Sequence, residues 1–211
     1  AAPGGKTTHI AQLSGDKATI YALDRRKKKV PVIKKNCARF GITSVTPLHM
    51  NASKSLLSDG QPFNPEAPIG FPAEYFDKIL LDPPCSGLGN RPRFRDDMTL
   101  NNLLQYHDYQ KKLFNVAVQL LKPGGTLVYS TCTIHPEENE NVVFFALQEY
   151  GYCLELVSQD PFVMGEPGLE TSELDEKERN MVQRFDPRAD VDTIGFFIAK
   201  FKKTSSFNKK P

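Results

Sequence analysis

Two cysteines stand in surroundings that could support covalent chemistry. Cys85 lies in the stretch LDPPCSGLG (81–89), and Cys132 lies in YSTCTIHPEENE (129–140). The thiolate of cysteine is the most nucleophilic side chain available for covalent catalysis, so either residue is a candidate nucleophile. Cys37 and Cys153 fall in apolar patterns and are predicted to be core residues. The four cysteines form no C-x-x-C pair, which disfavours a zinc site, and we expect free thiols rather than disulfides.

The first residues, AAPGGKTTHI (1–10), form a glycine-containing loop that admits two interpretations. Gly5-Lys6-Thr7 resembles the end of a phosphate-binding P-loop, and the strand-like KILLD (78–82) would then supply an acid to magnesium. Alternatively, Asp24 lies at the end of the next expected strand, where a carboxylate binds the ribose hydroxyls of a nucleoside cofactor. Asp24 could also cap the helix expected from Arg25. The glycine pattern is not G-x-G-x-x-G, so a dinucleotide is not specifically indicated.

Short apolar or β-branched runs alternate with helical patterns along the chain. We expect strands over 18–24, 44–50, 76–82, 126–132, 152–157 and 194–201, and helices over 25–40, within 99–121 and from Pro136 to Gly151. Residues 59–72 are predicted to form a proline-rich loop, 158–193 to be largely loop, and 204–211 to fray. The apolar faces of the first two helices should be Val30, Ile33, Cys37 and Phe40, and Tyr106, Leu113, Val116, Ala117 and Leu120. Pro31 leaves the start of the first helix uncertain.

This alternation predicts an α/β fold with a mostly parallel, doubly wound sheet covered on both faces. In such sheets, ligands bind beyond the carboxyl ends of the strands. One site is therefore expected from the residues at or just after predicted strand ends, which are Asp24, Asn51, Asp82, Cys85 and Cys132. The AAPGGK loop should itself follow a strand, so we expect that the chain lacks the first, central strand of its fold.

The composition is ordinary for a globular protein. The 211 residues are 39% hydrophobic and 25% charged, which predicts one domain with a sizeable core. No stretch approaches the roughly 20 apolar residues of a membrane span. The net charge of +2 is too small to indicate nucleic acid by itself. Free cysteines without a visible secretory signal favour the cytoplasm, with the nucleus as an alternative.

The combination of P-C-S-G, S-T-C-T and AAPGGKTTH resembles the Sun (Fmu) family of S-adenosylmethionine-dependent RNA cytosine-5 methyltransferases. The resemblance runs to DTIGFFIAKF (192–201) and so covers nearly the whole chain. It implies a Rossmann-like class I methyltransferase domain over residues 1–203, incomplete at its N-terminus, followed by a disordered tail. KTTHIAQL, QRFDP and DTIGFFIAKF most resemble the sixth vertebrate Sun-domain type, which acts on transfer RNA and messenger RNA. The resemblance sets the P-loop interpretation aside.

The family assigns roles to matching residues. Cys132 would be the nucleophile, Cys85 would help to resolve the covalent adduct, and Asp82 would hold the cytosine ring and its amine. S-adenosylmethionine would lie against Asp24, Asn51, Asp82 and the loop Ala1, Ala2, Pro3, Gly4, Gly5 and Lys6. The family usually has Asp at the position of Asn51. An amide oxygen can still accept from the adenine amino group, but without the charge that strengthens such a bond.

The remaining polar segments leave alternatives open. Arg25–Lys29 and Asn90–Arg95 are candidate phosphate contacts, although for the first a solvated helix start is the favoured interpretation. His135 could cap a helix or act as a base, and Glu137, Glu138 and Glu140 favour a helix N-terminus rather than a metal. We predict a monomeric RNA cytosine-5 methyltransferase that uses S-adenosylmethionine and no metal. An amino-methyltransferase and a catalytically inactive RNA-binding fragment are the alternatives.

Overall fold

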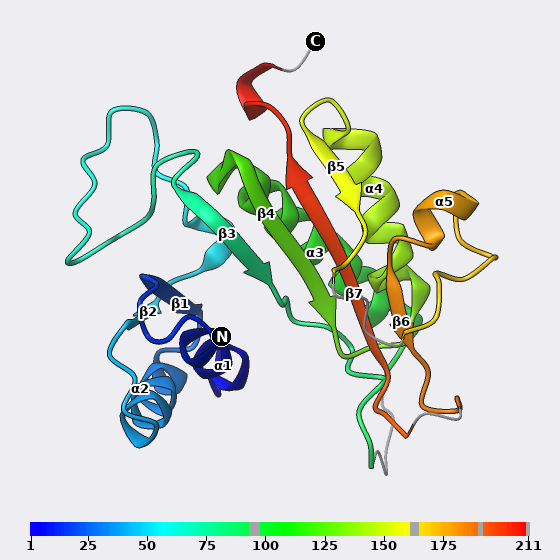
Figure 1. Cartoon of the computed structure of the whole chain (residues 1–211), viewed down its shortest axis with the longest axis horizontal. Coiled ribbons are helices and arrows are strands. Elements are labelled where there is room, and N and C mark those ends of the chain that lie inside the picture. The colour runs from blue at the N-terminus through cyan, green and yellow to red at the C-terminus, as the bar shows by residue number, and fades with distance from the viewer. Residues whose placement is uncertain (93–97, 161–164, 190–191, 210–211) are drawn as a thin grey trace. The chain divides into compact units, whose positions relative to one another are not determined.

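The computed structural model describes residues 1–92, 98–160, 165–189 and 192–209, in two units. The first unit (1–72) is built on two parallel strands, β1 (Ile20–Asp24) and β2 (Val45–His49), with Asp24 opposite His49. Two helices belong to it, α1 (Gly5–Leu13) and α2 (Val30–Arg39), together with the short 3-10 turns η1 (Lys27–Lys29) and η2 (Ala52–Lys54) (Figure 1). β1 and β2 fall inside the two strands predicted from the sequence.

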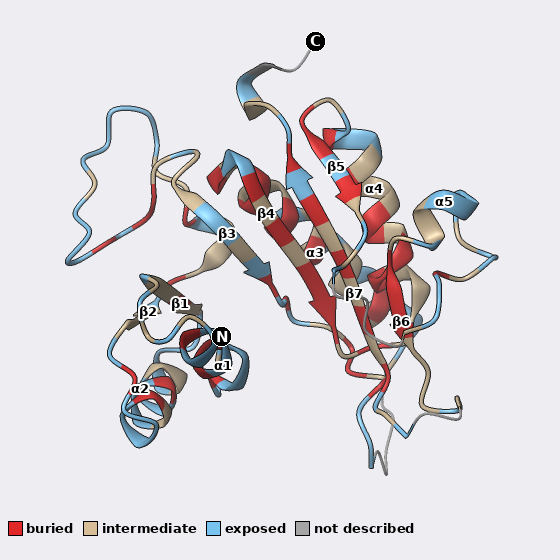
Figure 2. Cartoon of the chain, viewed as in Figure 1, coloured by how far each residue is buried: buried red, intermediate tan, exposed pale blue. Residues whose placement is uncertain are grey.

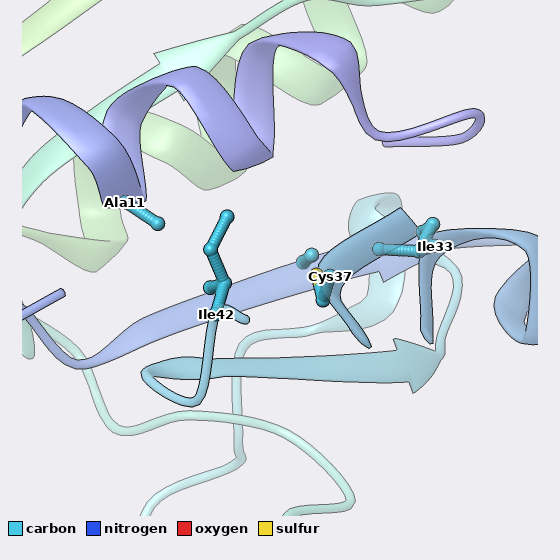
Figure 3. Close-up of a cluster of buried hydrophobic side chains, with 5 residues drawn as sticks. Ala11, Ile33, Cys37 and Ile42 are labelled. Carbon is cyan, nitrogen blue, oxygen red and sulfur yellow. The ribbon is translucent and has the colours of Figure 1, made fainter. Parts of the chain in front are cut away.

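The first unit has its own small core. Its cluster of buried hydrophobic residues comes from both helices, from β1 and from the loop after α2, and consists of Ala11, Ala22, Ile33, Cys37 and Ile42. Figure 3 shows four of them gathered in one cluster. Ile33 and Cys37 lie one helical turn apart in α2, as their spacing predicts, whereas Phe40 at the end of that helix is 52% exposed. The prediction that Phe40 belongs to the buried face was therefore wrong, because the helix ends there.

The second unit (73–211) contains a mixed sheet in the order β3-β4-β7-β5, with β6 also paired to β7. Its strands are β3 (Phe76–Leu81), β4 (Leu121–Thr131), β5 (Leu154–Val157), β6 (Gln183–Phe185) and β7 (Phe196–Lys203). β3 and β4 are parallel, while β7 is antiparallel to β4, β5 and β6. The predicted α/β class is thus confirmed, with a sheet of mixed direction (Figure 1).

Helices α3 (Leu100–Leu120) and α4 (Glu140–Tyr150) pack against this sheet and against each other. Buried residues follow β4 and β7 along much of their length (Figure 2). Phe114 of α3 contacts Phe201 of β7 edge to face, with ring centroids 5.3 Å apart. Aromatic rings thus join α3 to the sheet within a core that is otherwise largely aliphatic.

Several boundaries differ from the sequence prediction for local reasons. α2 begins at Val30 rather than Arg25, because Pro31 fits only the first turn of a helix. The helix expected from Pro136 is a 3-10 turn, η3 (Pro136–Glu138), followed by α4 after Asn139. β4 begins at Leu121, and its pairing with β3 shifts across the KPGG segment.

Segments that were predicted as loop or tail also contain structure. The stretch 158–193 includes β6 and the short helix α5 (Glu176–Arg179), although 161–164 and 190–191 lie outside the described residues. Residues 204–209 are tied to the second unit, since Thr204 N donates to Cys153 O and the turn η4 (Phe207–Lys209) places Phe207 against Tyr150. Within the described residues, no helix is long and apolar enough to cross a membrane.

Candidate active site

The two motif cysteines meet at the carboxyl ends of β3 and β4. These strands are parallel neighbours, so the loops that follow them leave the same edge of the sheet. Cys85 Sγ and Cys132 Sγ are 3.3 Å apart, and both side chains are half-buried. This distance is well above the roughly 2.05 Å of a disulfide, and both cysteines are free. The sequence prediction that these residues share one edge is confirmed.

The two loops pair residue by residue beyond the cysteines. Ser86 Oγ and Thr133 Oγ1 are hydrogen-bonded at 2.8 Å, and Gly89 N donates to Cys132 O at 3.0 Å. Gly195 N in turn donates to Gly89 O at 2.9 Å. A Cβ built on Gly89 would lie 2.1 Å from Gly195 O, so only glycine allows this approach. The position of Cys132 is therefore tied to the P-C-S-G-L-G loop through the backbone as well as through sulfur.

The surroundings of the sulfur atoms favour a proton on Cys85. Its hydrogen bond with Cys132, its burial and the charge of Cys132 together raise the pKa of the Cys85 thiol far above its usual range. The two sulfur atoms share one hydrogen bond, in which either thiol can be the donor. Asn90 Nδ2 is a further donor, 3.6 Å from Cys132 Sγ. Hydrogen bonds to sulfur stabilise a thiolate, so this arrangement suits negative charge on Cys132.

Asp82 follows β3 directly at the same edge. Its carboxylate is exposed, and Oδ1 accepts from Ser130 Oγ at 3.4 Å. Asp82, Cys85 and Cys132 thus all stand in the second unit, on the two loops that follow β3 and β4. Of the contacts around them, the sequence indicated neither the Ser86–Thr133 pair nor the donor role of Asn90, because both depend on how the loops lie.

The acidic run after Cys132 lies at the starts of η3 and α4, as the sequence predicts. His135 does cap the next turn, since its Nδ1 accepts from Glu137 N, and this prediction is confirmed. Glu137 and Glu138 lie in the first turn of η3 and Glu140 lies in that of α4, and Glu138 and Glu140 are in addition fully buried. Glu140 forms an ion pair with Arg184 Nη1 at 2.8 Å, and Glu138 contacts the Cys85 loop. In the described part of the chain, no three or more His, Cys, Asp or Glu residues are placed to hold a metal.

The residues expected to bind the cofactor belong to the first unit. Gly4 precedes α1 with a φ of 105°, and no side chain caps the first turn, whose amide groups suit a carboxylate. The preceding loop is held by Asp24, whose Oδ2 accepts from Ala2 N at 3.0 Å, and by Asn36, which donates to Pro3 O at 2.8 Å. Although burial opposes its charge, backbone N–H groups of Arg26 and Ala2 keep the pKa of Asp24 below its ordinary value. Asp24 is therefore an ionised acceptor beside the loop.

Asn51 has a local structural role in addition to the predicted one. Its Oδ1 accepts from Ser53 N at 3.2 Å and from Ser53 Oγ at 3.0 Å, which caps η2. This oxygen is the atom expected to accept from adenine. Such a bond would have to compete with Ser53 for its lone pairs.

The structure describes all of the basic segment Arg25–Lys29 but only part of Asn90–Arg95. Arg25–Lys28 are exposed, and the turn η1 lies at the solvated start of α2. In Asn90–Arg95, Arg91 donates to Pro187 O, whereas residues 93–95 lie outside the described residues. A phosphate-binding role for either segment stays a prediction.

Known proteins share the sequence and the fold of this chain. The sequence model of the family described as 16S rRNA methyltransferase RsmB/F matches residues 1–202. The chain belongs to this family. The tRNA (cytosine(72)-C(5))-methyltransferase NSUN6 of Mus musculus is 42% identical across the whole chain, and the enzyme described as tRNA (cytosine(72)-C(5))-methyltransferase in Pyrococcus horikoshii is 40% identical over 96% of it. The chain spans about half of these relatives, 48% and 45% of their lengths.

A solved RsmB/F relative has the same fold. The crystal structure of NSun6 from Pyrococcus horikoshii with SFG superposes with a TM-score of 0.80 at 38% identity, over 98% of this chain and 47% of that one. The predicted Rossmann-like class I methyltransferase fold is thereby confirmed, as is the predicted family.

Proposed function

We propose that the protein transfers a methyl group from S-adenosylmethionine to carbon 5 of cytosine in RNA. Transfer RNA is the proposed substrate, with messenger RNA as a further one. The observation that carries the proposal is the Cys85–Cys132 pair, 3.3 Å apart beside Asp82 at the edge of the sheet. Membership of the RsmB/F family and relatives named for cytosine-C5 methylation of tRNA support it.

Carbon 5 of cytosine is a poor nucleophile, so methylation requires that the ring first be activated by a cysteine. The Cys132 thiolate adds to carbon 6, and the electrons of the ring double bond move toward carbon 5. Carbon 5 would then form its bond to the methyl group, whose bond to the cofactor sulfur would break and leave its electron pair on that sulfur. Loss of the carbon-5 proton to a base restores the double bond, and the carbon–sulfur bond breaks to return the Cys132 thiolate. The Asp82 carboxylate holds the cytosine by accepting a hydrogen bond from its exocyclic amine.

The residues of the first unit fit the cofactor. S-adenosylmethionine, when bound, supplies an electrophilic methyl group on its sulfonium. The uncapped amides that start α1 suit its carboxylate, and the ionised Asp24 suits the ribose hydroxyls. The proposed cofactor residues in the first unit are Ala1, Ala2, Pro3, Gly4, Gly5, Lys6, Asp24 and Asn51, and Asp82 of the second unit is proposed as a further one.

Trapping tests the covalent step. In the full-length protein, a tRNA transcript with 5-fluorocytosine at position 72 should form a covalent complex that survives denaturing electrophoresis, because fluorine blocks loss from carbon 5. Cys132→Ala should abolish both this complex and methylation of ordinary tRNA. Cys153→Ala is the matched control, since that thiol is buried in the core and should be dispensable. Methylation retained by Cys132→Ala would refute the proposed nucleophile.

A further inference from the structure

Two buried polar side chains hold the backbone on both sides of Cys85. Gln110 of α3 and Glu138 of η3 are each 0% exposed. Gln110 Nε2 donates to Pro84 O at 3.0 Å and to Glu138 Oε2 at 2.9 Å. The same Oε2 accepts from Ser86 N at 2.9 Å. The residues before and after Cys85 are therefore both anchored to this pair.

The pair is itself fixed from two other elements. Tyr129 of β4 donates to the Glu138 carbonyl at 2.6 Å, and its ring lies in the aromatic core. His107, one turn before Gln110 in α3, has its Nδ1 2.6 Å from Glu137 O. A rigid frame of β4, α3 and η3 thus sets where Glu138 and Gln110 lie, and through them where the Cys85 loop lies.

Stability alone does not account for this arrangement. Burying an ionisable group and an amide is costly unless their hydrogen-bonding capacity is used. Yet Glu138 Oε1 and Gln110 Oε1 have no hydrogen-bond partner among the described residues. Apolar side chains would fill the same volume without that cost. What the polar pair provides is a fixed position for the Pro84–Ser86 backbone.

We propose that Gln110 and Glu138 are positioning residues that hold Cys85 against Cys132 for the release of the methylated base. This inference rests on the proposed function. During release, the bond between Cys132 Sγ and carbon 6 breaks while the carbon-5 proton leaves, and the electron pair returns to sulfur. The Cys85 S–H, 3.3 Å away, hydrogen-bonds the departing sulfur and stabilises its charge without a net transfer of its proton. If the Cys85 loop drifts, addition and methyl transfer continue but release slows.

The expected signature is an enzyme–RNA adduct that accumulates with ordinary tRNA. In the full-length protein, Cys85→Ala should accumulate it, and Glu138→Ala and Gln110→Ala should do the same with a turnover rate at least about ten-fold below wild type. Glu138→Gln keeps an oxygen for Ser86 N and Gln110 Nε2, so it should release the RNA at nearly the wild-type rate. Gln183→Ala is the matched control, because it removes another fully buried glutamine with an unpartnered Oε1 and should give no adduct.

The adduct also reports on folding, because only a folded enzyme can form it. If Glu138→Ala melts below the assay temperature, Glu138→Asp shortens the anchor by one methylene and should still accumulate adduct. Failure of Cys85→Ala to accumulate adduct would count against the proposed function itself. Adduct with Cys85→Ala but wild-type turnover in the Gln110 and Glu138 variants would overturn the inference. Folded variants that lose methylation without any adduct would overturn it too, since the pair would then serve attack rather than release.

Discussion

At the residue scale, the two cysteines differ because their neighbours differ. Cys85 is the residue whose thiol pKa is raised, through its hydrogen bond with Cys132, its burial and the charge of its partner. Cys132 Sγ shares a hydrogen bond with Cys85 Sγ and also accepts from the Asn90 amide. From the sequence, the order of the two roles came only from the family resemblance. The structure adds a physical argument for the same order, since a nucleophile needs the thiolate and a stabilising partner needs the proton.

The Asn90 contact leads to a prediction about thiol reactivity. Asn90→Leu keeps a similar volume but removes the N–H that lies 3.6 Å from Cys132 Sγ. A neutral hydrogen bond is worth about 0.5–1.5 kcal/mol, so alkylation of Cys132 by iodoacetamide should slow by about 2- to 10-fold. The rate is measured by mass spectrometry of the Cys132 peptide. Asn90→Gln, which retains an amide donor, is the control. Equal alkylation rates of Cys132 in Asn90→Leu and in wild type would contradict the proposed hydrogen bond from Asn90.

At the scale of elements, the sequence predicted the strand ends well and the contacts between loops poorly. The β3 and β4 positions followed from apolar runs, and the common edge followed from the rule for parallel strands. Gln110 was not predicted as buried, because a polar side chain interrupts the apolar stripe of α3. Glu138 looked like an ordinary acid at a helix start. Its partner Ser86 lies far away in the sequence, and only the packed fold brings them together.

The contact between the Cys85 loop and β7 gives a prediction at this scale. In Gly89→Ala, the new Cβ would meet Gly195 O at 2.1 Å, so the loop must move away from Cys132 O and from the segment that enters β7. We expect a loss of about 1–3 kcal/mol in unfolding free energy and a larger fractional loss of methylation. Urea unfolding and methyl transfer to tRNA measure the two effects.

Gly60→Ala is the comparison for that variant. A Cβ on Gly60 has nothing within 4 Å, although its φ of 78° makes the substitution mildly strained. It should reduce stability without reducing the rate of the folded enzyme. Equal effects of the two substitutions on methylation would show that the Gly89 contact has no part in placing Cys132.

At the scale of the whole molecule, the two units divide the proposed chemistry. The first contains the loop and carboxylate assigned to the cofactor, and the second contains the cysteines and the aspartate assigned to the base. Each unit has its own strands, helices and buried side chains. The residues of each short motif are therefore placed by contacts within one unit. Chain length alone does not predict such a division, because length carries no information about which segments contact each other.

Each unit also contains a carboxylate that makes its stability depend on pH. In the first unit, hydrogen bonds from Ser44 and Thr43 hold the pKa of Asp16 well below its usual range, and Asp16 joins the end of α1 to the start of β2. In the second unit, hydrogen bonding to Arg188 outweighs burial and lowers the pKa of Asp186 to about 2. Both carboxylates hold their protons more weakly in the folded than in the unfolded chain.

Stability from these two groups should therefore be complete above about pH 4, the ordinary aspartate pKa, and should be lost as the pH falls toward 2. Urea unfolding followed by circular dichroism at pH 5, 3.5 and 2.5 measures this loss. Asp16→Asn and Asp186→Asn should each be less stable than wild type at pH 5 and should lose less on acidification, since a neutral side chain has no proton to gain. Asp59→Asn, in the exposed proline-rich loop, is the control. If Asp16→Asn and Asp186→Asn lose as much stability between pH 5 and 2.5 as wild type does, other carboxylates control the acid sensitivity of the fold.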